Sequence, residues 1–168
     1  MNLFPDSTKK FESLLNIAIK YLAYQPRTVY EMKKYLEKRE FSENIAIKII
    51  EILVDQKYLN DKDFTRLFLE SRVKNKPKSK FALGYELKKK GISPSLIEAV
   101  LTPYDDQALA LKAARPKIKL WQNLDDETFK KKMLNFLRYR GFSFDICIST
   151  LNQFIKSNSA MKEDKNEN

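Results

Sequence analysis

The chain has 168 residues, of which 43% are hydrophobic and 12% aromatic, which argues against disorder of the whole chain and allows a sizeable core. Its 32 basic and 22 acidic side chains give a net charge of +10, which favours a polyanionic partner, either nucleic acid or an acidic protein face. With no histidine, one cysteine and three widely separated glycines, it lacks the usual zinc sites, disulfides and phosphate-cradling loops.

The predicted elements are helices, because only 3 glycines and 6 prolines interrupt the chain. The first helix carries an apolar stripe from Phe11 to Leu22, and Thr28 with Glu31 forms a capping box for the second. Another helix opens after Asn60. No strand is needed to account for any segment.

Two aspartates and one proline mark the expected helix boundaries in the C-terminal part. Asp105 opens a helix that Pro116 is expected to break or kink. Asp125, the first of three consecutive acidic residues, opens the next helix. These acids are the only dense candidate for a carboxylate metal site, but a helix start explains them better because they complement its free N–H groups and dipole.

One motif occurs three times, at residues 36–42, 87–93 and 137–143, with a period of about 50 residues. In each copy a basic helix end is followed by a turn residue, an apolar residue and a serine. Glycine suits the left-handed turn in the second and third copies, whereas Glu40 in the first suggests a different helix stop. The serines are expected to cap the next helix: Ser42, Ser93 and Ser143.

Apolar residues recur at matching distances around this motif. They stand nine residues before the apolar turn residue and four and nine residues after it: Met32, Leu83 and Met133, then Ile45, Leu96 and Ile146, then Ile50, Leu101 and Leu151. Such agreement predicts that each repeat buries the same helix faces.

The predicted fold is therefore all-α, with three tandem three-helix repeats that resemble helix-turn-helix units and form an elongated or curved array. The repeats are placed at residues 8–58, 59–104 and 105–155. Residues 156–168 are polar and lack periodicity, which predicts a disordered tail.

The middle repeat is the electrostatic centre, because residues 62–104 carry 10 basic and 4 acidic side chains, a net charge of +6. Lysines alternate with Asn, Pro and Ser from Lys74 to Lys80, which predicts a loop that presents positive charge to phosphates or an acidic partner, although a merely solvated loop is the alternative. We expect this stretch, together with Arg72, to supply most of the attraction to a polyanion.

Most aromatic residues fall at helical spacing and belong to the core. Four of them lie off the main apolar stripes and are expected to be exposed: Tyr30, Tyr85, Trp121 and Tyr139. Cys147 lies on an apolar face and is expected in the core instead of acting as a nucleophile.

Five segments together resemble the RecX family signature. They are residues 57–61 (KYLND), Phe64, residues 71–72 (SR), residues 86–92 (ELKKKGI) and residues 136–143 (FLRYRGFS), and the resemblance covers residues 14–154. The family pattern differs at three places. It begins its first motif with glycine where Lys57 stands, has a glycine-containing segment in place of residues 75–79, and often has Arg-Ile near Phe81.

This resemblance implies a modulator, mainly an inhibitor, of the RecA recombinase. It implies binding to the RecA–single-stranded-DNA filament and limits on its extension, ATPase, strand exchange and coprotease activities. The expected RecA- or DNA-contacting residues are the cations of the second repeat and of the last basic helix end: Arg66, Arg72, Lys74, Lys76, Lys78, Lys80, Lys88, Lys89, Lys90, Arg138 and Arg140.

The chain itself is expected to be no enzyme and to need no cofactor or metal. No signal peptide or transmembrane run is visible, so we expect a soluble, cytoplasmic monomer that binds no membrane. Two other classes stay open: a helix-turn-helix regulator that binds DNA directly, and a pure protein scaffold.

Overall fold

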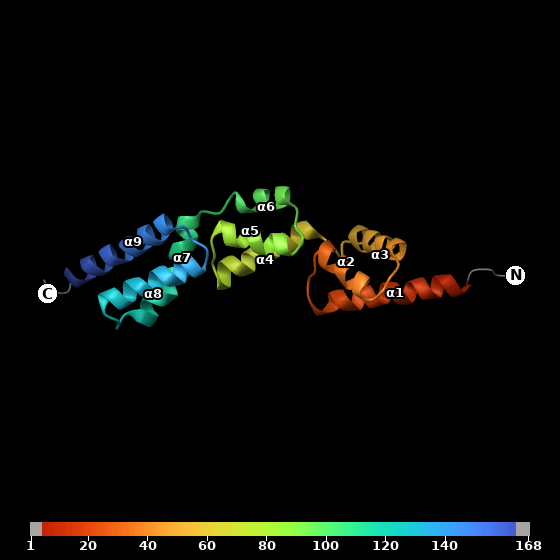
Figure 1. Cartoon of the computed structure of the whole chain (residues 1–168), viewed down its shortest axis with the longest axis horizontal. Coiled ribbons are helices and arrows are strands. Elements are labelled where there is room, and N and C mark those ends of the chain that lie inside the picture. Colours follow the sequence, from red (N-terminus) through yellow and green to blue (C-terminus); the bar gives the residue numbers. More distant parts are fainter. Residues whose placement is uncertain (1–4, 164–168) are drawn as a thin grey trace. The chain divides into compact units, whose positions relative to one another are not determined.

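Helices account for the part of the chain that the structure describes. The computed structural model describes the backbone of residues 5–163 and the side chains of residues 9–155. Over this range there are nine helices and no strand: α1 Pro5–Tyr24, α2 Val29–Lys38, α3 Glu43–Asp55, α4 Asp61–Asn75, α5 Lys80–Lys89, α6 Pro94–Leu101, α7 Asp106–Trp121, α8 Asp126–Tyr139 and α9 Phe144–Glu163 (Figure 1). The predicted all-α class is confirmed. None of these helices is both long and apolar enough to cross a membrane.

The recurrent apolar positions form the core. Six of them, two in each of α2, α5 and α8, are completely buried: Met32, Leu36, Leu83, Leu87, Met133 and Leu137. In the first repeat α3 packs against α1 and α2, and in the third α7, α8 and α9 contact one another. The period in the sequence therefore reflects which helix faces are removed from water.

The turn after α2, α5 and α8 has the same geometry in all three repeats. Its residue is left-handed in each case, with φ of 61° at Glu40, 77° at Gly91 and 86° at Gly141. The next amide donates to a carbonyl five residues earlier, at 3.2 Å each time: Phe41 to Leu36, Ile92 to Leu87 and Phe142 to Leu137. This is the Schellman arrangement, so the different helix stop expected at Glu40 is wrong.

Side-chain caps start the second helix of every repeat. The side chains of Thr28, Ser79 and Asp125 each accept a hydrogen bond from the amide three residues on, and Thr28 and Glu31 complete the predicted capping box. The predicted cap at Ser42 is wrong. Its backbone is extended as an N-cap requires, but its exposed side chain makes no capping hydrogen bond.

Serine caps are weak in the other two repeats. The hydroxyls of Ser93 and Ser143 accept from amides three residues on, Leu96 and Ile146, at 3.4 Å, which is long for a hydrogen bond. The turn before the third helix is therefore fixed mainly by the left-handed residue and the buried apolar residue after it.

Successive repeats are joined by hydrogen bonds at one helix end. The hydroxyl of Thr28, at the start of α2, donates to the carbonyl of Lys90 at 2.7 Å. At the equivalent place in the next repeat, the amide of Ser79 donates to the carbonyl of Arg140 at 3.1 Å. Thr28 and Ser79 are both buried. The start of one helix thus satisfies the C-terminal carbonyl of the corresponding helix in the following repeat.

A second bond repeats in the same place. The amides of Val29 and Lys80, the first residues of α2 and α5, donate to aspartate side chains that open the first helix of the next repeat. The partners are Asp61, at 2.9 Å, and Asp106, at 2.7 Å. Each aspartate therefore pairs with a helix N-terminus, where the dipole favours a negative charge.

The hydrogen bonds of Thr28 and Val29, and those of Ser79 and Lys80, form two joints between successive repeats. These joints explain how the chain divides into two compact units. One unit runs to Leu67 and includes Leu87–Ile97, and the other contains Phe68–Glu86 and the chain from Glu98 onward. The division passes through α4, α5 and α6, because the end of α5 packs with the first repeat and its start packs with the third. The repeat boundaries at 58/59 and 104/105 stay predictions.

Two helices extend past predicted ends. Pro116 lies inside α7 and does not break it, since Pro116 and Lys112, whose carbonyl loses its partner, are both exposed to solvent. The backbone of residues 156–163, predicted as part of a disordered tail, continues α9, where no glycine or proline interrupts the chain. Residues 164–168 of the predicted tail lie outside the described residues.

Two residues with side chains occupy left-handed backbone, so glycine should stabilise the fold there. Glu40 and Lys57 have φ of 61° and 62°, and both are exposed. Glu40→Gly and Lys57→Gly are each expected to raise stability by up to about 1 kcal/mol, because relief of strain exceeds the added entropy of the unfolded chain. Urea unfolding followed by circular dichroism measures this. Lys48→Gly, exposed in the middle of α3, should instead destabilise by about 1 kcal/mol.

Candidate functional site

Lys78 of the predicted basic loop, and Arg72 before it, are built into the fold. Glu86 accepts hydrogen bonds from Arg72 at 2.8 Å and from Lys78 at 2.5 Å, and the guanidinium of Arg72 also covers the ring of Phe68. Only 29% of the Lys78 side chain is exposed. Lys74 lies in the last turn of α4 and Lys80 begins α5, so the loop proper is residues 76–79.

Two more of the predicted contact residues serve the joints between repeats. Lys90 forms an ion pair with Glu31 at 2.8 Å and lies over the ring of Phe64. Arg140 donates to the carbonyl of Pro77 at 3.2 Å and lies over the ring of Phe136. Their charges are therefore partly occupied by the protein itself.

The remaining predicted cations are mostly at the surface. Lys74, Lys76, Lys88 and Arg138 are exposed, as are Arg66 and Lys89. Arg66 forms an ion pair with Asp63 at 3.8 Å, and Lys80 is half-buried with its amide bonded to Asp106. The exposed members divide between the two compact units, and Lys74, Lys76 and Arg138 share the second.

The exposure of the aromatic side chains agrees only partly with the prediction. Tyr30, Tyr85 and Tyr139 are exposed as predicted, whereas Trp121 is half-buried and meets Phe136 edge-on at 6.0 Å. Phe81 was not predicted to be exposed, but 81% of it is. The sequence repeat could have predicted that Phe81 is exposed, because Phe81 stands one repeat period after Tyr30, which was predicted to be exposed.

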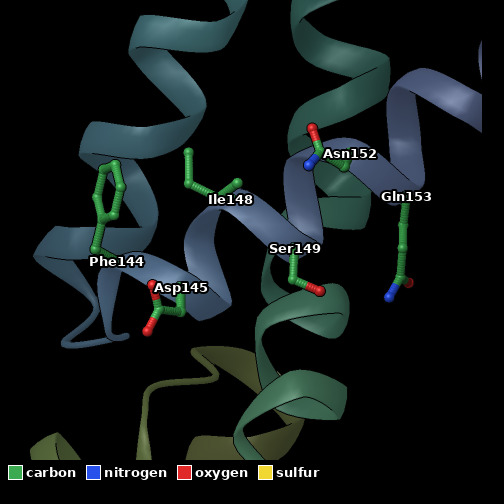
Figure 2. Close-up of a pocket in the computed structure, with 6 residues that line it drawn as sticks. All are labelled: Phe144, Asp145, Ile148, Ser149, Asn152 and Gln153. Atoms are coloured by element: carbon green, nitrogen blue, oxygen red, sulfur yellow. The ribbon is translucent and has the colours of Figure 1, made fainter.

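The helix that a helix-turn-helix protein would turn toward the bases is α9 in the third repeat, and six of its side chains line a shallow pocket. Figure 2 shows these six along successive turns of this one helix: Phe144, Asp145, Ile148, Ser149, Asn152 and Gln153. Only Asn152 and Gln153 suit base edges, and Asp145 would repel phosphates. This face of α9 is therefore poorly suited to sequence-specific DNA recognition.

The corresponding face of the first repeat is acidic. A groove between α2 and α3 is lined by apolar residues, among them Phe41 and Ile47, and by Glu37, Glu43 and Glu51. Lys33 also lines the groove and pairs with Glu37 at 4.0 Å. The three glutamates of this face would repel a nucleic-acid backbone.

Cys147 belongs to the core, as predicted. It is completely buried in α9, and its thiol lies 3.8 Å from the carbonyl oxygen of Phe142. Burial raises the pKa of this thiol, against a smaller opposing effect of the Arg138 charge. The reactive thiolate is therefore disfavoured.

Three comparisons with known proteins agree with one another. Models of the first, second and third three-helix domains of RecX match residues 15–53, 60–101 and 104–151 in that order. A regulatory protein RecX from Chlorobium phaeobacteroides (strain BS1) is 36% identical over 152 residues, which are 90% of this chain and 97% of that protein. One from Streptococcus agalactiae serotype Ia is 28% identical and matches 95% of this chain but only 64% of its own length.

Solved structures show the same fold. The crystal structure of RecX from Lactobacillus salivarius superposes with a TM-score of 0.71 at 24% identity, over 87% of this chain and 97% of that one. A crystal structure of a regulatory protein RecX gives a TM-score of 0.67 at 22% identity, over 84% and 71%. At such identities the likeness supports the arrangement of helices, not individual contacts.

The carboxylate of Glu86, which Arg72 and Lys78 share, is expected to stabilise the fold less in acid than at neutral pH. Burial alone would raise the pKa of Glu86, but the hydrogen bonds and charges of Lys78 and Arg72 outweigh it and hold that pKa below its ordinary value. A carboxyl group whose pKa is lower in the folded than in the unfolded state stabilises the fold at pH values above its unfolded-state pKa. This stabilisation is lost as the pH falls through the folded-state pKa.

Glu86→Gln should therefore lower the melting temperature at pH 7, and its deficit relative to the parent should shrink as the pH falls below about 5. Thermal unfolding across that range measures the difference. Glu98→Gln removes the same charge from an exposed position and serves as the control. A deficit of constant size at every pH would contradict an ionic role for Glu86.

Proposed function

This chain belongs to the RecX family, and we propose that it regulates the RecA recombinase by binding the RecA–single-stranded-DNA filament. In this proposal it limits filament extension and thereby restrains ATPase, strand exchange and coprotease activity. It acts as a monomer in the cytoplasm, where that filament forms. The observation that carries the proposal is the ordered match of all three RecX domains across residues 15–151.

The charge distribution supports a partner that is itself a polyanion. Exposed lysines gather around the end of α4 and the loop before α5, where Lys74 and Lys76 have no carboxylate between them. Phosphates of a DNA-bound filament or an acidic RecA face would both be attracted to this region. The first repeat, with its acidic groove, is less suited to that contact.

A direct DNA-binding regulator is the second candidate. The three-helix units resemble helix-turn-helix modules, which place one helix in the major groove. The outer face of α9 and the acidic face of α3 offer few side chains for base edges, which weakens this candidate. A scaffold that binds protein alone is the third.

One binding experiment separates the three candidates. The protein is titrated against naked DNA, RecA alone and the RecA–DNA–nucleotide filament at several salt concentrations. The proposed function requires preference for the filament, together with inhibition of RecA-dependent ATP hydrolysis. Equal affinity for naked DNA and filament would favour the direct DNA-binding regulator, and binding to RecA without DNA at all salt concentrations would favour the scaffold.

The exposed lysines should act through phosphates or acidic side chains of the partner. Replacing Lys74 and Lys76 with Gln is expected to weaken inhibition of RecA and to flatten the salt dependence of log K by roughly 0.7 to 0.9 for each phosphate that is no longer neutralised. Neither side chain supports a buried contact, so the helix content should stay that of the parent. Inhibition assays at several salt concentrations measure both effects.

A matched variant controls for net charge. Lys20→Gln with Lys48→Gln removes the same charge from exposed positions of α1 and α3 and should inhibit like the parent. If the Lys74 and Lys76 variant also inhibits like the parent at every salt concentration, the contact lies elsewhere, and Arg138 and Arg140 become the better candidates. Arg72→Ala is expected to lower the melting temperature before it lowers binding, because Arg72 pairs with Glu86.

The proposal includes no chemistry by this chain. The lack of histidine, of a glycine-rich loop and of a reactive cysteine leaves few groups from which to build a catalytic site. We expect the purified protein to show neither nucleotide hydrolysis nor nuclease activity. An activity that survives stringent purification and disappears on substitution of one carboxylate would refute this expectation.

A further inference from the structure

We propose that the surface where α5 begins and α8 ends binds single-stranded nucleic acid directly, with Phe81 and Tyr139 stacking on unpaired bases. Lys76 and Arg138 would contact the phosphates between those bases. This inference deepens the proposed function and rests on it, since it assigns part of the filament contact to the nucleic acid and to named side chains.

Hydrogen bonds bring two distant segments together at this surface. The amide of Ser79 donates to the carbonyl of Arg140 at 3.1 Å, and the guanidinium of Arg140 donates to the carbonyl of Pro77 at 3.2 Å. A Cβ atom at Gly141 would lie 2.8 Å from the Cβ of Ala82, so the two backbones touch. Phe81 precedes Ala82 and Tyr139 stands two residues before Gly141, so both residues belong to the segments that meet here.

The two rings do nothing for the core. Phe81 is 81% exposed and Tyr139 is 87% exposed, whereas Leu83 and Leu137, two residues away in each helix, are completely buried. Tyr85, one turn after Phe81 on α5, is 55% exposed. Large aromatic side chains at such exposure, next to cations, are typical of surfaces that stack on nucleic-acid bases.

The charges around the rings are arranged for an anionic ligand. Lys76 and Arg138 are exposed and stand three and two residues before Ser79 and Arg140, whose backbones meet at this contact. Two carboxylates of these segments are already occupied: Glu86 accepts from Arg72 and Lys78, and Asp106 accepts from the amide of Lys80. The positive charge that faces solvent is therefore not cancelled by those two acids.

Unpaired bases distinguish this ligand from duplex DNA. In a duplex each base is stacked between its neighbours, so an aromatic side chain cannot reach its face without unstacking it. A single strand offers every base face to Phe81 and Tyr139, and stacking of this kind tolerates any sequence. The surface should therefore prefer single strands and show little sequence preference.

Three labelled probes test the assignment by fluorescence anisotropy with the full chain. They are an oligothymidylate, an abasic oligonucleotide of the same length, and a duplex. Phe81→Ala and Tyr139→Ala are each expected to weaken oligothymidylate binding by roughly 5- to 150-fold without changing the salt slope. Both should leave binding to the abasic strand and to the duplex unchanged, because neither offers a base face.

Substitution of a cation should affect strands with and without bases equally, because a cation contacts phosphates and not bases. Lys76→Gln is expected to weaken binding to the oligothymidylate and to the abasic strand alike, and to reduce the salt slope by about 0.7. Tyr24→Ala removes a ring that is 88% exposed on α1 and is the control, with affinity for every probe expected to match the parent.

Two results would overturn the proposal. The first is that the parent does not bind the oligothymidylate at low salt, or that Phe81→Ala and Tyr139→Ala bind it as the parent does. The second is that these variants keep oligothymidylate affinity but no longer inhibit RecA, which would make the rings anchors for a protein partner. The second result leaves the proposed function standing, whereas a parent that binds the oligothymidylate but never affects RecA would refute only the proposed function.

Discussion

A carbonyl at the C-terminal end of a helix has no partner within that helix, and the joints between repeats depend on supplying one. Lys90 and Arg140 present such carbonyls, and the buried Thr28 and Ser79 donate to them. A buried polar group left without its bond costs roughly 1–3 kcal/mol, so each joint tolerates few alternatives. The turn glycine belongs to the same constraint, since a Cβ atom at Gly91 would lie 2.2 Å from the Cβ of Tyr30.

This constraint explains why the first repeat differs from the other two. All three turns need a left-handed residue, but Gly91 and Gly141 also lie directly against a side chain from the preceding repeat. Glu40 is exposed, so its turn carries the strain of a left-handed backbone without any steric demand on its Cβ atom. The close approach of two repeats thus requires glycine at positions 91 and 141, whereas a left-handed backbone by itself only favours glycine.

The sequence predicted what depends on local spacing and missed what depends on long-range partners. The burial of Met32, Leu83 and Met133 follows from a period that any helix packed on one face must show. The ion pairs of Glu86 could not be predicted, because Lys78 and Arg72 precede it by 8 and 14 residues across a helix break. Alternation of lysine with small polar residues predicted a loop that presents positive charge, because nothing local reveals the half-buried carboxylate of Glu86 with which Lys78 pairs.

Net charge alone therefore does not locate the binding surface in such a protein. Every cation contributes to the long-range field that attracts a polyanion, including those held by the joints and by Glu86. Short-range contact is left to the cations that the framework does not use, and Lys76 and Arg138 are among them because neither supports a neighbouring repeat. Substitution of Lys90 or Arg140 would disturb a joint together with any contact, since Lys90 pairs with Glu31 and Arg140 bonds to Pro77. Weaker binding in those variants would thus report on the stability of the array, whereas the same weakening at an exposed cation reports on the partner itself.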